Sequence, residues 1–223
     1  FIWRSILWDC RLQNVHFISQ FTHFSTMTRT YSLLFVLFFS LTTSACAQNA
    51  TDRHAINQAI SAAPDELKEG ASVYGYNENG TLKLIREGTN ELVCTTDDPA
   101  REGFEAACFQ KDLLDYISRG RVLRAEGMNG QESVDKRKAE IEAGTLPFVK
   151  GQATQYIRYG ENASYDEATG EVMNSQVRFV IYVPGATPES TGLPISPMAP
   201  GAPFIMDAGS FRAHIMIVPP AGN

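Results

Sequence analysis

The residue types of a hydrolytic triad occur together near the C-terminal end of the chain. Asp207, Ser210 and His214 lie within eight residues of one another. A histidine can accept a serine proton while a carboxylate orients its ring, so this set could support ester or lactone hydrolysis. In characterised triads, however, the members come from separate segments, and no G-x-S-x-G motif surrounds Ser210. Turn-forming roles for Asp207 and Ser210 are the competing interpretation.

His214 is central to any catalytic or metal-binding hypothesis, because His54 is the only other histidine after residue 47. Strand alternation places Arg212, His214 and Met216 on one face of a terminal strand. Arg212 and Met216 are therefore candidate ligand-binding residues, and His214 with Met216 could carry a metal ion. The alternative is a histidine that is hydrogen-bonded within a half-buried sheet.

Other polar clusters do not match metal or cofactor motifs. The two histidines and two cysteines after residue 47 lack the spacing of a zinc site. The acidic groups at 97–98 and 166–171 lack the alternating ligands and the glycine of a calcium loop. Glycines are spread singly and do not form a phosphate-binding loop. We therefore expect no cofactor and no resident metal.

The two cysteines after residue 47, Cys94 and Cys108, predict a structural disulfide. A pair of cysteines in an oxidising compartment commonly forms one bond. Closing this loop of about 15 residues is worth about 3 kcal/mol in the chain-entropy model. A redox pair normally has the much closer C-x-x-C spacing.

Residues 27–47 have the parts of a cleavable secretory signal in the required order. A short segment with one positive charge precedes the apolar run at 33–39, and the small residues at 44–47 suit a signal peptidase. The apolar run is too short for a stable membrane span, which needs about 20 residues. Residues 1–26 precede the first methionine and are interpreted as upstream translation.

Two cleavage chemistries remain open at this signal. An A-x-A site at residues 45–47 predicts simple cleavage and a periplasmic protein. The stretch 43–46 also resembles a lipobox, in which a lipid on Cys46 would anchor the protein at the outer membrane. Either outcome places the mature protein outside the cytoplasm.

The charge balance disfavours nucleic acid and anionic lipid as partners. The chain has 19 basic and 25 acidic residues and a net charge of −6. Residues 1–47 contain three arginines and one aspartate, so 16 basic and 24 acidic residues remain after them, a balance of −8. Nucleic acid and anionic lipid both favour clustered Lys and Arg. The expected partner is a small molecule or an envelope protein, with the membrane reached only through a lipid on Cys46.

Hydrophobic spacing predicts three strands, two helices and then four strands. The first three strands, around an Asn79–Gly80 turn, are expected to form an antiparallel meander. A long helix is predicted to begin at Glu105, with Phe109 and Leu113 on its apolar stripe. The remaining ranges are residues 72–76, 81–86 and 91–95 for the first strands, 132–143 for the second helix, and 152–159, 176–183, 204–207 and 211–218 for the last strands.

This order predicts an α+β fold with an antiparallel sheet of about six or seven strands and two central helices packed on one face. A single domain is expected at residues 71–220, because no linker or internal repeat divides it. Residues 48–70 are expected to form an N-terminal segment with a short helix at 54–62.

Several stretches together resemble sequences of one group of proteins. They are residues 86–90, 94–99, 121–127, 182–187 and 203–216. Over most of residues 70–220 the chain is similar to a group of uncharacterised exported bacterial proteins, although it has Phe204 and Ala208 where that group has Trp and Pro. The resemblance implies a bacterial, exported, single-domain protein, and it brings no activity and no catalytic residue.

These observations favour an exported, non-catalytic domain that binds a small ligand or a partner in the cell envelope. The first alternative is a small ester or lactone hydrolase that uses His214 with Asp207 and Ser210. The second is a metal carrier that uses His214 and Met216. Turnover of an ester and lactone panel by a His214→Ala variant would separate the first alternative from the others.

Overall fold

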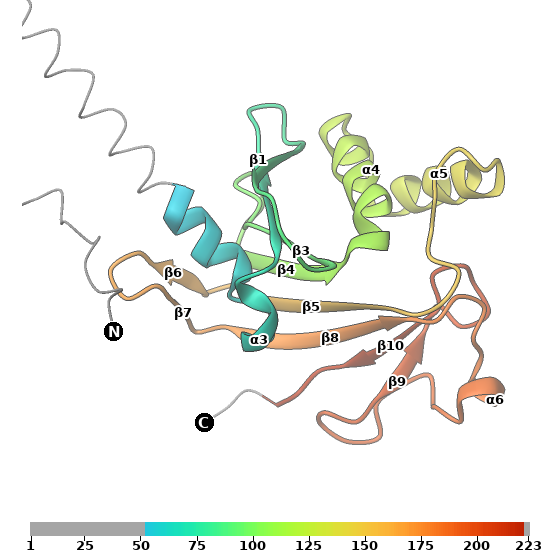
Figure 1. Cartoon of the computed structure of the whole chain (residues 1–223). Coiled ribbons are helices and arrows are strands. Elements are labelled where there is room, and N and C mark those ends of the chain that lie inside the picture. The colour runs from blue at the N-terminus through green and yellow to red at the C-terminus, as the bar shows by residue number, and fades with distance from the viewer. Residues whose placement is uncertain (1–51, 221–223) are drawn as a thin grey trace, which may run out of the picture. The chain divides into compact units, whose positions relative to one another are not determined.

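The computed structural model describes residues 52–220, which fold around one large β-sheet (Figure 1). Its eight strands have the order β2-β1-β3-β4-β5-β8-β10-β9. They are β1 (Ser72–Tyr76), β2 (Leu82–Arg86), β3 (Leu92–Thr95), β4 (Phe104–Gln110), β5 (Ala153–Gly160), β8 (Gln176–Tyr182), β9 (Phe204–Met206) and β10 (His214–Ile217). The predictions for residues 1–26, for the signal at 27–47 and for Cys46 lie outside the described residues. Within residues 52–220, no helix has the length and apolar character needed to cross a membrane.

The fold is α+β, as predicted, but its sheet is mixed because β1 pairs in parallel with β3. The antiparallel meander is therefore wrong at its third strand, which adds to β1 and not to β2. The turn at residues 87–91 carries the chain from β2 past β1 to the edge where β3 pairs with β1. A Cβ atom on Gly88 would lie 2.3 Å from the Ser72 nitrogen, and the amides of Thr89 and Asn90 both donate to the carbonyl oxygen of Gly70.

The long helix predicted from Glu105 is also wrong at its start. Residues 104–110 form β4, and α4 (Leu114–Ala125) begins after a short 3-10 turn (Lys111–Leu113). Phe109 and Leu113 do share one core cluster. However, β4 is buried on both faces of the sheet, and such a strand has a continuous apolar run that periodicity cannot distinguish from a helix.

The predicted disulfide joins Cys94 of β3 to Cys108 of β4. The two residues lie directly opposite each other, with Cα atoms 4.0 Å apart, and both are fully buried. The short N-terminal helix occupies residues 52–60 and packs over this face through Ala59. α3 (Asp65–Lys68) follows it and extends the same apolar cluster.

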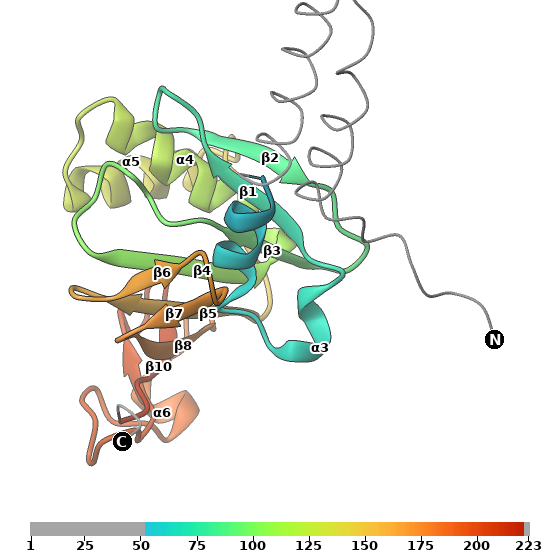
Figure 2. The same cartoon turned by 90° about the vertical axis from the view of Figure 1, so that its left-hand side faces the viewer.

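The opposite face of the sheet carries α4, and α5 (Gly130–Glu142) packs beside α4 (Figures 1 and 2). α5 begins at Asn129, whose side chain forms a capping box with Glu132. Arg119 of α4 and Glu140 of α5 join the two helices through an ion pair with an N–O distance of 2.7 Å. The predicted pair of central helices is therefore present.

Short elements complete the domain. β6 (Ser164–Asp166) and β7 (Glu171–Met173) form a separate hairpin, and α6 (Pro188–Thr191) is a single helical turn. The proline-rich loop at residues 193–203 runs along β9, where the amide of Ile205 donates to the carbonyl oxygen of Pro194.

Candidate anion-binding site

A hollow of about 450 Å³ lies between α4, the start of α5 and strands β5, β8 and β10. The strand register assembles its floor. His214 and Tyr182 are direct neighbours across β10 and β8, while Gln155 of β5 and Arg178 of β8 project from the same face of the sheet. The hollow thus lies on the face opposite the disulfide.

Five arginines line this hollow, and none of its lining residues within 52–220 is an aspartate or glutamate. They are Arg121 and Arg124 of α4, Arg137 of α5, Arg178 of β8, and Arg212 just before β10. Asn129 and Gly130 bring the N-terminus of α5 to the same hollow, where the helix dipole is positive. On a chain with a net charge of −6, this is a local concentration of positive charge.

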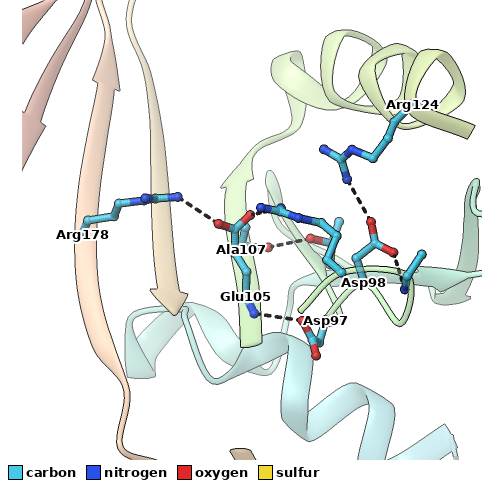
Figure 3. A network of polar contacts seen from close by, with 9 residues as sticks. Asp97, Asp98, Glu105, Ala107, Arg124 and Arg178 are labelled. Atoms are coloured by element: carbon cyan, nitrogen blue, oxygen red, sulfur yellow. Dashed lines mark hydrogen bonds and ion pairs between the residues drawn. The ribbon is translucent and has the colours of Figure 1, made fainter. Parts of the chain in front are cut away.

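Carboxylates outside the hollow hold two of these arginines in position. Arg124 donates to Oδ2 of Asp98 at 2.9 Å, and the buried Asp98 also accepts from the amide of Ala100 (Figure 3). Arg212 pairs with Asp207 at 2.6 Å. Each guanidinium is thereby oriented, while its remaining N–H groups stay available to a ligand.

Glu105 of β4 holds a third arginine, Arg178, at 2.9 Å (Figure 3). The same carboxylate pairs with Arg101 at 3.3 Å, and the amide of Glu105 donates to Asp97 at 2.9 Å. Burial raises the pKa of Asp97, although backbone hydrogen bonds act in the opposite direction. Arg178 also lies 4.6 Å from the ring centre of Tyr159, so its plane is fixed from two sides.

The other two arginines, Arg121 and Arg137, have no carboxylate within 4.0 Å in the described part of the chain. Arg121 lies 5.8 Å from the ring centre of Tyr76, and its buried Nε has no hydrogen-bond partner among residues 52–220. Arg137 lies 4.0 Å from the ring centre of Tyr116 and donates to the carbonyl oxygens of Ser133 and Tyr116. No nearby carboxylate neutralises these two charges.

A glycine within α4 makes room for Arg137. A Cβ atom on Gly120 would lie 2.8 Å from Nη1 of Arg137, closer than side chains normally approach. Glycine inside a helix costs about 0.5–1 kcal/mol relative to alanine. Gly120 therefore lowers helix stability and lets the guanidinium lie against α4.

Each arginine also raises the electrostatic potential at its neighbours, which lowers the pKa of those neighbours. Burial lowers the pKa of Arg124, and the nearby Arg121 and Arg101 lower it further. Burial likewise lowers the pKa of Arg137, with smaller contributions from Arg212 and Arg121. Guanidiniums nevertheless remain protonated at neutral pH. A bound anion would relieve this mutual repulsion.

Tyr116 and Tyr182 line the hollow, and the rings of Phe148 and Phe211 pack against them. Phe148 packs edge-on against Tyr116, Tyr182 and Phe211, with ring centroids 4.7, 5.9 and 5.4 Å away. Burial raises the pKa of Tyr116, and burial together with Tyr116 raises the pKa of Tyr182 to about 12. Both phenols are therefore neutral at physiological pH and add hydrogen-bonding groups without negative charge.

The structure brings only part of the predicted triad together. His214 is buried, and its Nδ1 lies 2.8 Å from the carbonyl oxygen of Arg212, so Nδ1 carries the hydrogen. Asp207 is 3.9 Å from the same nitrogen, too far for a hydrogen bond, and pairs with Arg212 instead. Ser210 accepts from the amide of Arg212, and in the described residues no hydrogen bond joins it to His214.

Asp207 and Ser210 also take the turn positions that formed the competing interpretation. The amide of Ser210 donates to the carbonyl oxygen of Asp207, whose φ of 51° is in the left-handed region. Both residues line a second hollow, beside α5, that does not include His214. Of the predicted site residues, Arg212 and His214 line the arginine hollow.

Met216 does not line the arginine hollow but packs against a core cluster that includes Ala107, Ile157 and Val180. No group of three or more His, Cys, Asp or Glu side chains within residues 52–220 is placed to hold a metal ion. His214 and Met216 thus share a strand face, and the carboxylate of Asp207, 3.9 Å from Nδ1 of His214, does not complete a set of three ligands with them.

Sequence reasoning missed four of the five arginines. Arg121 and Arg124 are three residues apart, a spacing that puts both on one face of a helix, and Gly120 interrupts the same helix without ending it. Two arginines on one face of a helix, next to a glycine without an explanation in the sequence, were the pattern that could have indicated this site. Arg137 and Arg178 lie far away in sequence and join them only through the fold.

No protein-family model, no curated protein and no solved structure matches this chain. The geometry of the arginine hollow is therefore the basis for a functional proposal.

Proposed function

We propose that this protein is an exported domain that binds a small anionic molecule in the arginine hollow, without a resident cofactor. The observation that carries the proposal is the lining of five guanidiniums, of which Arg121 and Arg137 have no carboxylate partner in residues 52–220. Unpaired, partly buried charges are costly, and an anionic ligand supplies the missing partner. Guanidinium groups match carboxylates and phosphates in shape and charge.

The size of the site supports a small molecule as the ligand. Hollows of about 300–1,000 Å³ are typical of small-molecule sites, and this one holds about 450 Å³. The buried disulfide is typical of proteins that work in an oxidising compartment, which agrees with the secretory signal predicted at residues 27–47. Intact mass and fractionation of the natively produced protein test export. An uncut cytosolic chain with both thiols free would contradict it.

Isothermal titration of the purified, oxidised protein with inorganic phosphate and small carboxylates tests the binding function. Charge-assisted hydrogen bonds contribute about 1.5–3 kcal/mol each, so Arg121→Gln and Arg137→Gln should each weaken binding by about 10- to 100-fold. Lys136→Gln is the matched control, because Lys136 is the exposed neighbour of Arg137 on α5 and removes the same charge outside the hollow. Absence of anion binding, or equal losses in all three variants, would overturn the proposal.

The hydrolase alternative remains testable in the same hollow, since His214 lines it beside Arg212. Wild-type protein and a His214→Ala variant are compared on a panel of ester and lactone substrates. Turnover that disappears with His214 would favour the enzyme, whereas no turnover by the wild type would eliminate it. Metal analysis of the purified protein tests the metal-carrier alternative.

A further inference from the structure

We infer that the ligand carries two separate negative groups, as a linear dicarboxylate does, one for Arg121 and one for Arg137. The inference rests on the proposed function and specifies its ligand class. Five arginines line the hollow, and carboxylates hold three of them: Asp98 holds Arg124, Glu105 holds Arg178 and Asp207 holds Arg212. Two positive charges remain without a carboxylate partner in residues 52–220, so a ligand with two negative charges balances them.

The two free guanidiniums belong to different helices and lie against different rings. Arg121 of α4 faces Tyr76 of β1 and also borders a neighbouring hollow towards β4. Arg137 of α5 lies over Tyr116. Because the two guanidiniums come from different helices and lie against different rings, a ligand with two anionic groups can offer one group to each.

Each guanidinium offers a different set of donors. Nε of Arg121 is buried, whereas neither of its terminal nitrogens has a hydrogen-bond partner in residues 52–220, so a carboxylate can accept from Nη1 and Nη2 together. Nε and Nη1 of Arg137 already donate to backbone carbonyl oxygens, which leaves Nη2 for the ligand. The first group of the ligand is thus held by two hydrogen bonds and the second by fewer.

Apolar groups also line the hollow and suit a carbon skeleton. They are the side chains of Ile117 and Met128 and the rings of Tyr116 and Tyr182. A short methylene chain or a ring between two carboxylates would contact this surface. Inorganic phosphate has no such apolar part.

Calorimetric titration with linear dicarboxylates from malonate to adipate, monocarboxylates of equal carbon number, and inorganic phosphate tests the inference on the purified, oxidised protein. We expect one dicarboxylate length to bind at least tenfold more tightly than its matched monocarboxylate and more tightly than phosphate. The Arg121→Gln and Arg137→Gln variants should each bind this dicarboxylate only as tightly as its matched monocarboxylate. Lys136→Gln should retain the preference.

The outcomes separate this inference from the proposed function. If monocarboxylates or phosphate bind as tightly as every dicarboxylate, and binding still requires the arginines, the hollow is an anion site and the two-group ligand is wrong. If no anion binds, both proposals fail. Should a glutamine variant not fold, Arg121→Met and Arg137→Met provide the same comparison, because methionine keeps a flexible apolar side chain and removes the positive charge.

Discussion

The two faces of the central sheet use helices for opposite purposes. On one face, residues 52–60 lie closely over the Cys94–Cys108 disulfide, and the small side chain of Ala59 permits this approach. On the other face, α4 and α5 leave a hollow that arginine side chains line. The first face is apolar and closed, as a stabilising core requires. The second holds two guanidiniums without a carboxylate partner in residues 52–220, and this contrast supports the proposed binding function.

Removing the disulfide should have the largest effect and should act on stability alone. The double variant Cys94→Ala and Cys108→Ala is expected to lose about 3 kcal/mol, which lowers Tm by about 6–12 °C in a domain of this size. Thermal unfolding followed by circular dichroism measures this change. Anion affinity at 20 °C should stay within twofold of the wild type. A parallel loss of affinity would show that the two faces are coupled.

Replacing Asp98 should give a smaller loss of stability on the arginine face. Asp98 is buried and its two oxygens accept from Ala100 and Arg124, so Asp98→Asn removes the negative charge that pairs with Arg124 and one of these two acceptors. Arg124 is partly exposed and solvent compensates part of the cost, so we expect about 1–2 kcal/mol. Urea unfolding of the variant and the wild type provides the measurement. A loss larger than that of the disulfide variant would contradict the proposed division between the faces.

Gly120→Ala should separate binding from stability. The added methyl group displaces the guanidinium of Arg137 from α4, while alanine favours the helix. We expect anion affinity to fall about tenfold, with Tm unchanged or slightly raised. Calorimetry and thermal unfolding of the same preparation test both parts. Unchanged affinity would mean that the position of Arg137 is unimportant for the ligand.

The ion pair between the two helices should have the smallest effect, and only at acidic pH. The hydrogen bond from Arg119 holds the pKa of Glu140 below its ordinary value. A lowered carboxyl pKa stabilises the fold at neutral pH, and this contribution is lost as pH falls through the lowered pKa. Glu140→Gln should therefore cost about 0.5 kcal/mol at pH 7 and less at pH 3, as unfolding curves at both values would show. A larger deficit at pH 3 would contradict this sign.

Local patterns predicted the elements whose residues interact with near neighbours in sequence. The helix predicted at residues 132–143 corresponds to α5, and the predicted turn at Asn79–Gly80 joins the first two strands. The disulfide was predicted because Cys94 and Cys108 are the two cysteines after residue 47. Errors arose where local pattern and tertiary burial disagree. The sequence of β4 resembles that of a helix because both faces of the strand are covered and its apolar run is continuous. The parallel pairing of β1 depends on a backbone contact at Gly88.

The sequence by itself determined that this is an acidic α+β chain with a disulfide between Cys94 and Cys108, because charge and cysteine content are properties of composition and turn residues act locally. Only the tertiary structure decided that arginines from α4, α5, β8 and the turn before β10 line one hollow. Their positions span residues 121–212, so no spacing rule relates them. Electrostatic interactions depend on distance in space, and the fold alone sets that distance.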